Sequence, residues 1–118
     1  MQINIMKNTP EAAISLLISV ALIDNYYSEE EEILILKLAS SYNYPSNKIE
    51  QLKNQILELD ENKFDICEKF IEQIEEQKLR EKLIEDISNL IASDHILHEN
   101  EIFVYKQIAQ KWGMYQSK

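Results

Sequence analysis

Two stretches of this sequence share one pattern and decide the fold: Ala21-Leu22-Ile23-Asp24-Asn25-Tyr26-Tyr27-Ser28-Glu29-Glu30-Glu31 and Ile91-Ala92-Ser93-Asp94-His95-Ile96-Leu97-His98-Glu99-Asn100-Glu101. In each stretch an Asp ends an apolar segment, and a large residue and then a polar residue follow it. A Glu closes each stretch at the same distance from the Asp. Self-similarity of this kind indicates two copies of one supersecondary unit.

The correspondence between the two copies continues beyond the quoted stretches, at the same sequence offset. The equivalent apolar and aromatic pairs are Ile14 and Ile84, Leu17 and Ile87, Leu38 and Ile108, Ala39 and Ala109, and Tyr42 and Trp112. Asn43 and Gly113 are also equivalent, and each is followed by a large residue. The sequence therefore predicts two helical hairpins, residues 12–44 and 82–114, related by a pseudo-twofold rotation.

The composition is typical of a helical protein. The chain has 118 residues, of which 45% are apolar and 28% are charged, with only one Gly and two Pro. Gly and Pro interrupt helices, whereas the abundant Leu, Ile, Glu, Lys and Gln lose little side-chain entropy in them. No segment has the alternating pattern of a strand. The expected fold is all-α, a compact bundle of six to seven helices forming one domain over residues 1–118.

Local capping signals predict where the helices begin and end. Thr9 precedes Pro10 and begins a first helix that runs to about Asp24. Ser28 and Glu31 have the spacing of a capping box and begin the second helix. The other expected boundaries are a stop at Asn43, a start at Ser46, a break at Asp60–Asn62, a bend within 75–78, and a last helix from His98 to Gly113.

The run from Ala12 to Ile23 is apolar on nearly every side. A membrane-spanning helix takes about 20 residues, so this run is too short, and no membrane insertion is expected. A short helix without a polar face is instead typical of the central, surrounded helix of a bundle. We expect it to pack against its repeat equivalent, Leu83 to Ala92.

The charge and cysteine content narrow the range of partners. A net charge of -9 argues against nucleic acid and against an anionic membrane surface, both of which attract clustered Lys and Arg. The same charge is compatible with a divalent cation or a basic protein partner. The single Cys67 excludes an internal disulfide and favours a cytoplasmic location.

The Asp and Glu of each copy meet at a tight helix corner, and two interpretations of them remain open. In the structural one, Asp24 and Asp94 accept hydrogen bonds from unpaired N–H groups while Glu31 and Glu101 cap back. In the functional one, the same four carboxylates coordinate a hard cation, calcium or magnesium. The spacing alone favours the structural interpretation, and it does not match an EF-hand loop.

The doubled pattern resembles the tellurite-resistance TerB-like family, whose relatives include the N-terminal domain of the membrane co-chaperone DjlA. The run Gln77-Lys78-Leu79-Arg80-Glu81-Lys82-Leu83-Ile84-Glu85-Asp86-Ile87 is also similar to the family's approach to its second copy. The resemblance implies a compact helical bundle with pseudo-twofold halves and an acidic patch for divalent cations. The residues that match this patch are Asp24, Glu31, Asp94 and Glu101.

The chain departs from the family at one repeated position. Asn25 and His95 stand where the family usually has Gly after the motif Asp. Asn tolerates a left-handed backbone better than His does, so the first copy is favoured as the cation site. An alternative transition-metal site would use His95, His98 and Glu101, but the equivalence of His98 with Ser28 favours a helix-start role instead.

The expected function is therefore that of a non-enzymatic, TerB-like module in a stress-related setting. It would bind a protein partner, with or without a divalent cation. The alternative is a purely acidic interaction domain in which the Asp and Glu pairs are architectural. An enzyme is disfavoured, because the chain offers no Ser–His–Asp or Cys–His arrangement and no glycine-rich phosphate loop.

Overall fold

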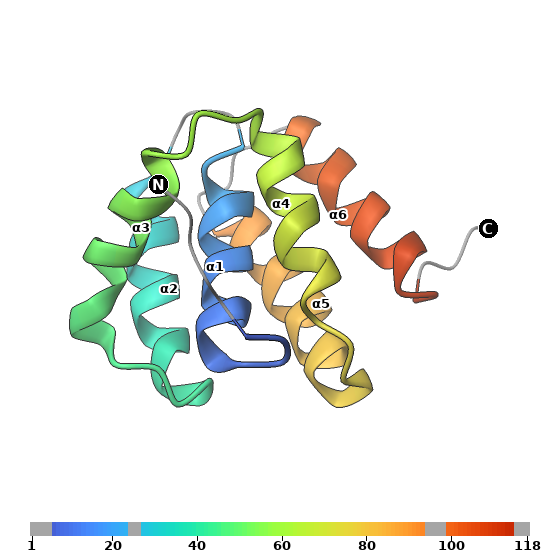
Figure 1. Cartoon of the computed structure of the whole chain (residues 1–118), viewed down its shortest axis with the longest axis horizontal. Helices are drawn as coiled ribbons and strands as arrows, with labels where there is room; N and C mark the ends of the chain where they lie inside the picture. Colours follow the sequence, from blue (N-terminus) through green and yellow to red (C-terminus); the bar gives the residue numbers. More distant parts are fainter. Residues whose placement is uncertain (1–5, 24–26, 94–98, 115–118) are drawn as a thin grey trace.

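The computed structural model describes residues 6–23, 27–93 and 99–114. Within these ranges the chain forms six α-helices and one short 3-10 helix, η1, and no strand. The elements are α1 (Pro10–Ala21), α2 (Glu29–Ser41), η1 (Ser46–Lys48), α3 (Ile49–Leu57), α4 (Lys63–Glu72), α5 (Gln77–Ala92) and α6 (Glu99–Lys111), shown in Figure 1. The predicted all-α fold is confirmed. No helix in the described ranges has the length and apolar character needed to span a bilayer.

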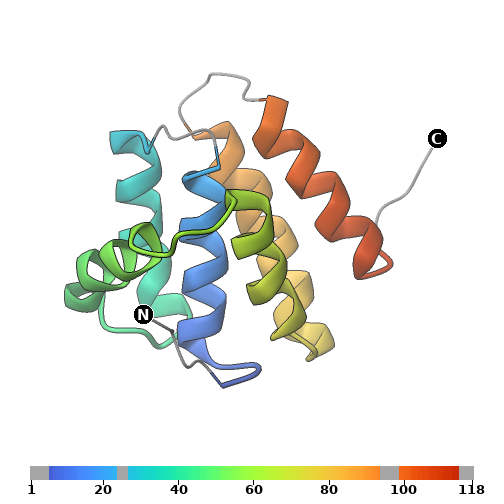
Figure 2. The ribbon, with the colours of Figure 1, turned by 45° about the horizontal axis from the view of Figure 1, so that its top comes forward.

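Helix α1 is the centre of the bundle, as its apolar sequence predicts. Every residue from Ala12 to Ile23 is buried, and α1 contacts all five other α-helices. Figures 1 and 2 show α1 beside α5, with the two helices running in the same direction. The hydroxyls of Ser15 and Ser19 are both buried inside α1, and that of Ser15 has no hydrogen-bond partner among the described residues. Ser19 donates to the carbonyl of Ser15 at 2.7 Å, so its polar group is satisfied within the helix.

The second helices of the two repeat copies, α2 and α6, begin and end at equivalent residues. Helix α2 begins at Glu29 and α6 at Glu99. Both helices stop at a residue with a left-handed backbone, Asn43 with φ 59° and Gly113 with φ 71°. In both, the next N–H reaches back to an alanine carbonyl and closes a Schellman motif; these bonds are Tyr44 to Ala39 at 2.9 Å and Met114 to Ala109 at 2.7 Å. Both predicted stops are therefore confirmed.

The start of the third helix differs from the prediction. Ser46 was expected to cap an α-helix, but it begins the 3-10 helix η1, and its side chain makes no capping bond. The N-cap position of α3 is Lys48, which already has helical backbone angles. A capping hydroxyl acts from an extended N-cap residue. Because the chain enters α3 directly from η1, no such residue precedes it.

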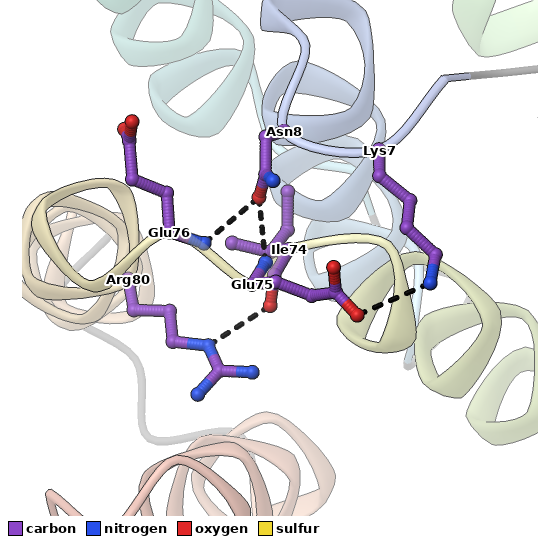
Figure 3. Close-up of polar contacts among 6 residues, drawn as sticks. All are labelled: Lys7, Asn8, Ile74, Glu75, Glu76 and Arg80. Carbon is purple, nitrogen blue, oxygen red and sulfur yellow. Dashed lines mark hydrogen bonds and ion pairs between the residues drawn. The ribbon is translucent and has the colours of Figure 1, made fainter.

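The bend between α4 and α5 is confirmed, and a residue far away in the sequence holds it (Figure 3). Asn8 has a left-handed backbone with φ 60°. Its Oδ1 accepts hydrogen bonds from the N–H of Glu75 at 2.6 Å and of Glu76 at 2.9 Å. Its own N–H donates to the carbonyl of Gln73 at 2.8 Å, and Lys7 Nζ lies 3.1 Å from the Glu75 carboxylate. The segment before α1 thus satisfies backbone groups that the bend leaves outside a helix.

Candidate functional site

The two candidate corners lie at the same end of the bundle. Helices α1 and α5 end there, and α2 and α6 begin there, at the top of Figures 1 and 2. Of the four predicted ligands, the structure describes Glu31 and Glu101. Asp24 and Asp94 lie outside the described residues, as do Asn25, Tyr26, His95 and His98.

At the first corner, Ser28 and Glu31 form the predicted capping box. The Ser28 hydroxyl accepts from the N–H of Glu31 at 3.0 Å, and Glu31 Oε1 accepts from the N–H of Ser28 at 3.0 Å. The Ser28 hydroxyl also lies 3.0 Å from Glu31 Oε1. These contacts satisfy unpaired donors at the start of α2 and place the carboxylate at the positive end of the helix dipole.

The acidic run at the start of α2 does not face solvent throughout. Glu29 and Glu30 are exposed, as expected for a solvated helix start. Glu31 is only 1% exposed, because its side chain turns back to cap the helix. Its second oxygen, Oε2, is buried and has no hydrogen-bond partner among the described residues. An unpartnered carboxylate oxygen in a protein interior is costly, so this atom is the most unusual feature of the first corner.

Tyr27 is partly buried against the core and is close enough to Glu31 to feel its charge. Its Oη is also buried without a hydrogen-bond partner among the described residues. Burial raises the pKa of the Tyr27 phenol above its usual range, and the negative charges of Glu32, Glu31 and Glu50 raise it further. Lys53 Nζ lies 5.1 Å from the centre of the Tyr27 ring. The neighbourhood of the first corner is therefore acidic and partly closed to water.

At the second corner, Glu101 occupies the position in α6 that Glu31 occupies in α2. It too is 1% exposed. The repeat thus places one buried glutamate in the first turn of the second helix of each hairpin, although most surface glutamates stay in water. Within the described ranges, no group of three or more His, Cys, Asp or Glu side chains is close enough together to hold a metal ion. The expected Asp–Glu pairs involve Asp24 and Asp94, which lie outside those ranges.

A buried polar network that sequence reasoning missed links α2 to α5. Tyr42 Oη donates to Asp86 Oδ2 at 2.6 Å, and Lys82 Nζ lies 3.2 Å from the same oxygen. Lys82 Nζ also lies 4.4 Å from the centre of the Tyr42 ring. Burial, and then the hydrogen bond to Asp86 and its charge, raise the pKa of Tyr42 above its usual range. The only local signal is that Lys82 and Asp86 are four residues apart, the spacing of neighbours on one helix face.

The equivalent aromatic of the second copy also receives a cation from α5. Arg80 lies over the Trp112 ring, with its guanidinium carbon 5.4 Å from the ring centre. Arg80 Nε donates to the carbonyl of Ile74 at 2.9 Å, which fixes the side chain across the bend (Figure 3). Trp112 is buried in the core just after the end of α6, as its repeat equivalent Tyr42 is after α2. Cation–π contacts of this kind stabilise by about 0.5–2 kcal/mol, depending on how dry they are.

Fold and site together define an acidic, all-helical module with a buried glutamate in the first turn of α2 and another in the first turn of α6. The chain belongs to the TerB family: the family model described as "Tellurite resistance protein TerB" matches residues 10–118. The match covers all six helices and both repeat copies, and it confirms the resemblance seen in the sequence. A search of curated proteins and a search of solved structures each found no match.

Proposed function

We propose that this chain is a non-enzymatic, cytoplasmic TerB module that binds a protein partner and holds a hard divalent cation at its helix corners. The ligands would be Asp24 and Glu31 at the first corner and Asp94 and Glu101 at the second. We propose further that residues 1–118 act as one domain, with repeat halves of about 12–44 and 82–114. A role in tellurite resistance or a related stress response is the setting that the family description suggests.

One observation supports the cation proposal more than any other. Glu31 has one oxygen engaged in the capping box and a second, buried oxygen without a partner in the described chain. A bound cation would offset the cost of burying that oxygen. Carboxylate oxygens suit calcium or magnesium, and the chain has no second thiol that would favour a softer metal.

Glu31 alone does not make a cation site. Calcium takes six to eight oxygen ligands, and magnesium keeps several waters around one or two carboxylates. Asp24 is the nearest acidic residue before Tyr27 in the sequence, so it is the natural second carboxylate. The first corner is the stronger candidate, because Asn25 tolerates a left-handed turn better than His95 does.

The experiment is a calorimetric titration with calcium and magnesium, together with thermal melts. Millimolar cation should raise Tm of the wild-type chain by mass action. Glu31→Gln keeps an oxygen for the capping bond but removes the charge, so it should abolish the rise. Glu30→Gln removes one negative charge from an exposed neighbour, and this variant should still show the rise in Tm. A wild-type melt that does not respond to either cation would refute the cation site.

The capping box itself favours a second candidate function, that of an acidic interaction domain without a cation. Ser28 and Glu31 make three contacts with each other at the start of α2, and these contacts give Glu31 a structural role. On this alternative the buried glutamates are architectural, and Glu31→Gln would lower stability equally with and without calcium. The same melts therefore distinguish the two functions.

A further inference from the structure

A groove lined by four apolar and four polar side chains, Gln107 and Gln110 of α6 among the polar ones, runs between α4 and α6. Its volume is about 430 Å³. The apolar lining consists of Phe64, Cys67, Ile71 and Val104. Glu68 of α4 and Lys111 of α6 stand at its polar edges. Figure 2 shows α6 diverging from the rest of the bundle toward its C-terminal end.

The length of the groove matches two turns of a helix. Its α4 wall extends from Phe64 to Ile71, and its α6 wall from Val104 to Lys111. Each wall therefore spans roughly 10 Å, at 1.5 Å per helical residue. A partner helix would present anchors at i, i+3 or i+4, and i+7 over the same distance.

Two aromatic side chains stand at one end of the groove and remain accessible. Phe64 and Phe103 meet edge to face, with ring centres 6.0 Å apart and planes at 80°. Phe64 is 37% exposed and Phe103 is 52% exposed, so their contact with each other leaves much of both rings accessible. Exposed aromatic side chains beside a partly apolar groove mark a binding surface, because Phe has a large area to bury and a defined packing geometry.

Among the residues that line the groove, Glu68 is acidic and Lys111 is basic, and an acidic stretch of α4 lies beside the groove. Asp65, Glu68 and Glu72 follow one another along the outer side of α4, and Lys69 among them lies 2.5 Å from the carboxylate of Glu61. Lys111 reaches across from α6 but lies 4.0 Å from Glu68 and 3.9 Å from Glu72. Exposed pairs at such distances contribute little, so a closer cation from a partner could replace them.

We propose that this groove binds an amphipathic helix of a partner protein, with its apolar face on the groove floor and Lys or Arg beside Glu68 and Glu72. The acidic stretch of α4 and the net charge of -9 select a basic partner. A second copy of this chain would bring the same acidic stretch against its own, which is repulsive. The inference names the partner class for the proposed module and does not depend on the cation.

The test is titration of the isotope-labelled chain with designed peptides, followed by amide shifts in NMR spectra in the presence of EDTA. The probe is a helical Leu/Lys peptide with all Leu on one face. Its controls are a scrambled peptide of the same composition and a Leu/Glu peptide with the same apolar face. The amphipathic basic peptide should bind saturably and shift amides along α4 and α6, and both controls should bind at least about tenfold more weakly.

Matched variants locate the binding surface. The double substitution Phe64→Ser and Phe103→Ser should weaken binding at least about tenfold, as expected for central aromatic anchors. The control double substitution, Ile33→Ser and Leu36→Ser, removes exposed apolar side chains from α2 instead and should not change binding.

A second pair of variants tests the charge and does not alter apolar packing. Glu68→Lys with Glu72→Lys should abolish the preference for the basic peptide. Glu58→Lys with Glu85→Lys makes the same change of net charge at exposed sites that do not line the groove, and should preserve the preference.

Several outcomes would overturn the inference. Equal binding of the scrambled peptide, shifts confined to other helices, wild-type affinity in both groove variants, or self-association through α4 and α6 would each do so. If neither cation raises Tm but the basic peptide still binds, the cation site alone is refuted. Failed peptide binding with an intact cation response would refute the groove alone.

Discussion

Tyr42 Oη lies 2.6 Å from Asp86 Oδ2 and joins the C-terminal end of α2 to the middle of α5. The first hairpin of the repeat is thereby tied to the first helix of the second hairpin. Lys82 contacts both partners, since its ammonium lies 3.2 Å from the Asp86 carboxylate and 4.4 Å from the Tyr42 ring centre. Asp86 is buried, with its side chain only 11% exposed, so its carboxylate depends on these two neighbours.

Replacing Tyr42 with Phe should lower the free energy of unfolding by about 2 kcal/mol. The substitution keeps the ring but removes a donor to a buried charge, which leaves Lys82 as the remaining partner of Asp86. Urea unfolding of Tyr42→Phe, Asp86→Asn and the double variant gives the coupling energy directly. If the losses of stability in the two single variants simply add in the double variant, the hydrogen bond between Tyr42 and Asp86 makes no specific contribution to stability.

The same contact predicts a loss of stability at alkaline pH. The pKa of Tyr42 is raised in the folded chain, by burial first and then by Asp86, whereas an unfolded Tyr ionises near about pH 10. The contribution is therefore fully present below about pH 10 and is lost as the pH rises above it, because only the unfolded state ionises readily.

The measurement is the free energy of unfolding as a function of pH, combined with an ultraviolet titration of the phenols. Tyr42→Phe should reduce the alkaline slope without removing it, since the pKa of Tyr27 is raised as well. Tyr105→Phe changes a tyrosine of α6 outside this network and serves as the control. An alkaline slope that is the same in Tyr42→Phe as in the wild type would contradict the assignment.

Asn8 should matter for two separable reasons. Its Oδ1 accepts two backbone N–H groups at the α4–α5 bend, and its φ of 60° is unfavourable for most residues (Figure 3). Asn8→Gly loses the bonds but keeps the backbone freedom, so it should lower the free energy of unfolding by about 1–2 kcal/mol. Asn8→Ala loses both and should cost about 1 kcal/mol more. Thermal or urea unfolding of the wild type and of both variants would measure these losses. Equal stability of the three proteins would show that the bend does not need Asn8.

The aspartates of the helix corners carry a prediction that separates architecture from function. If Asp24 and Asp94 cap the following helices, replacing either with Ala should lower stability by about 1 kcal/mol without added cation. Thermal melts in EDTA measure this, with Asp60→Ala, which changes an exposed acidic residue in the connection between α3 and α4, as the control. Unchanged melts for both corner variants would exclude the capping role and strengthen the case for ligand binding.

Much of the fold was accessible from the sequence because its signals are local. Ser28 and Glu31 form their capping box within one turn of helix, and Asn43 and Gly113 stop their helices through the left-handed backbone that each tolerates. The central place of α1 follows from a helix that has no polar face to turn toward water. Glu31 differs from its exposed neighbours Glu29 and Glu30, because its side chain turns back to Ser28 and becomes buried.

The sequence by itself determined the helices, the Ser28–Glu31 capping box and the stops at Asn43 and Gly113, because each of these depends on residues within a few positions of one another. Only the tertiary structure decided which distant groups meet. Asn8 at the α4–α5 bend and Tyr42 on Asp86 join residues far apart in the chain, and a one-dimensional pattern does not encode such pairs. The α4–α6 groove is of the same kind, since it depends on how closely two helices approach after both have packed on their neighbours.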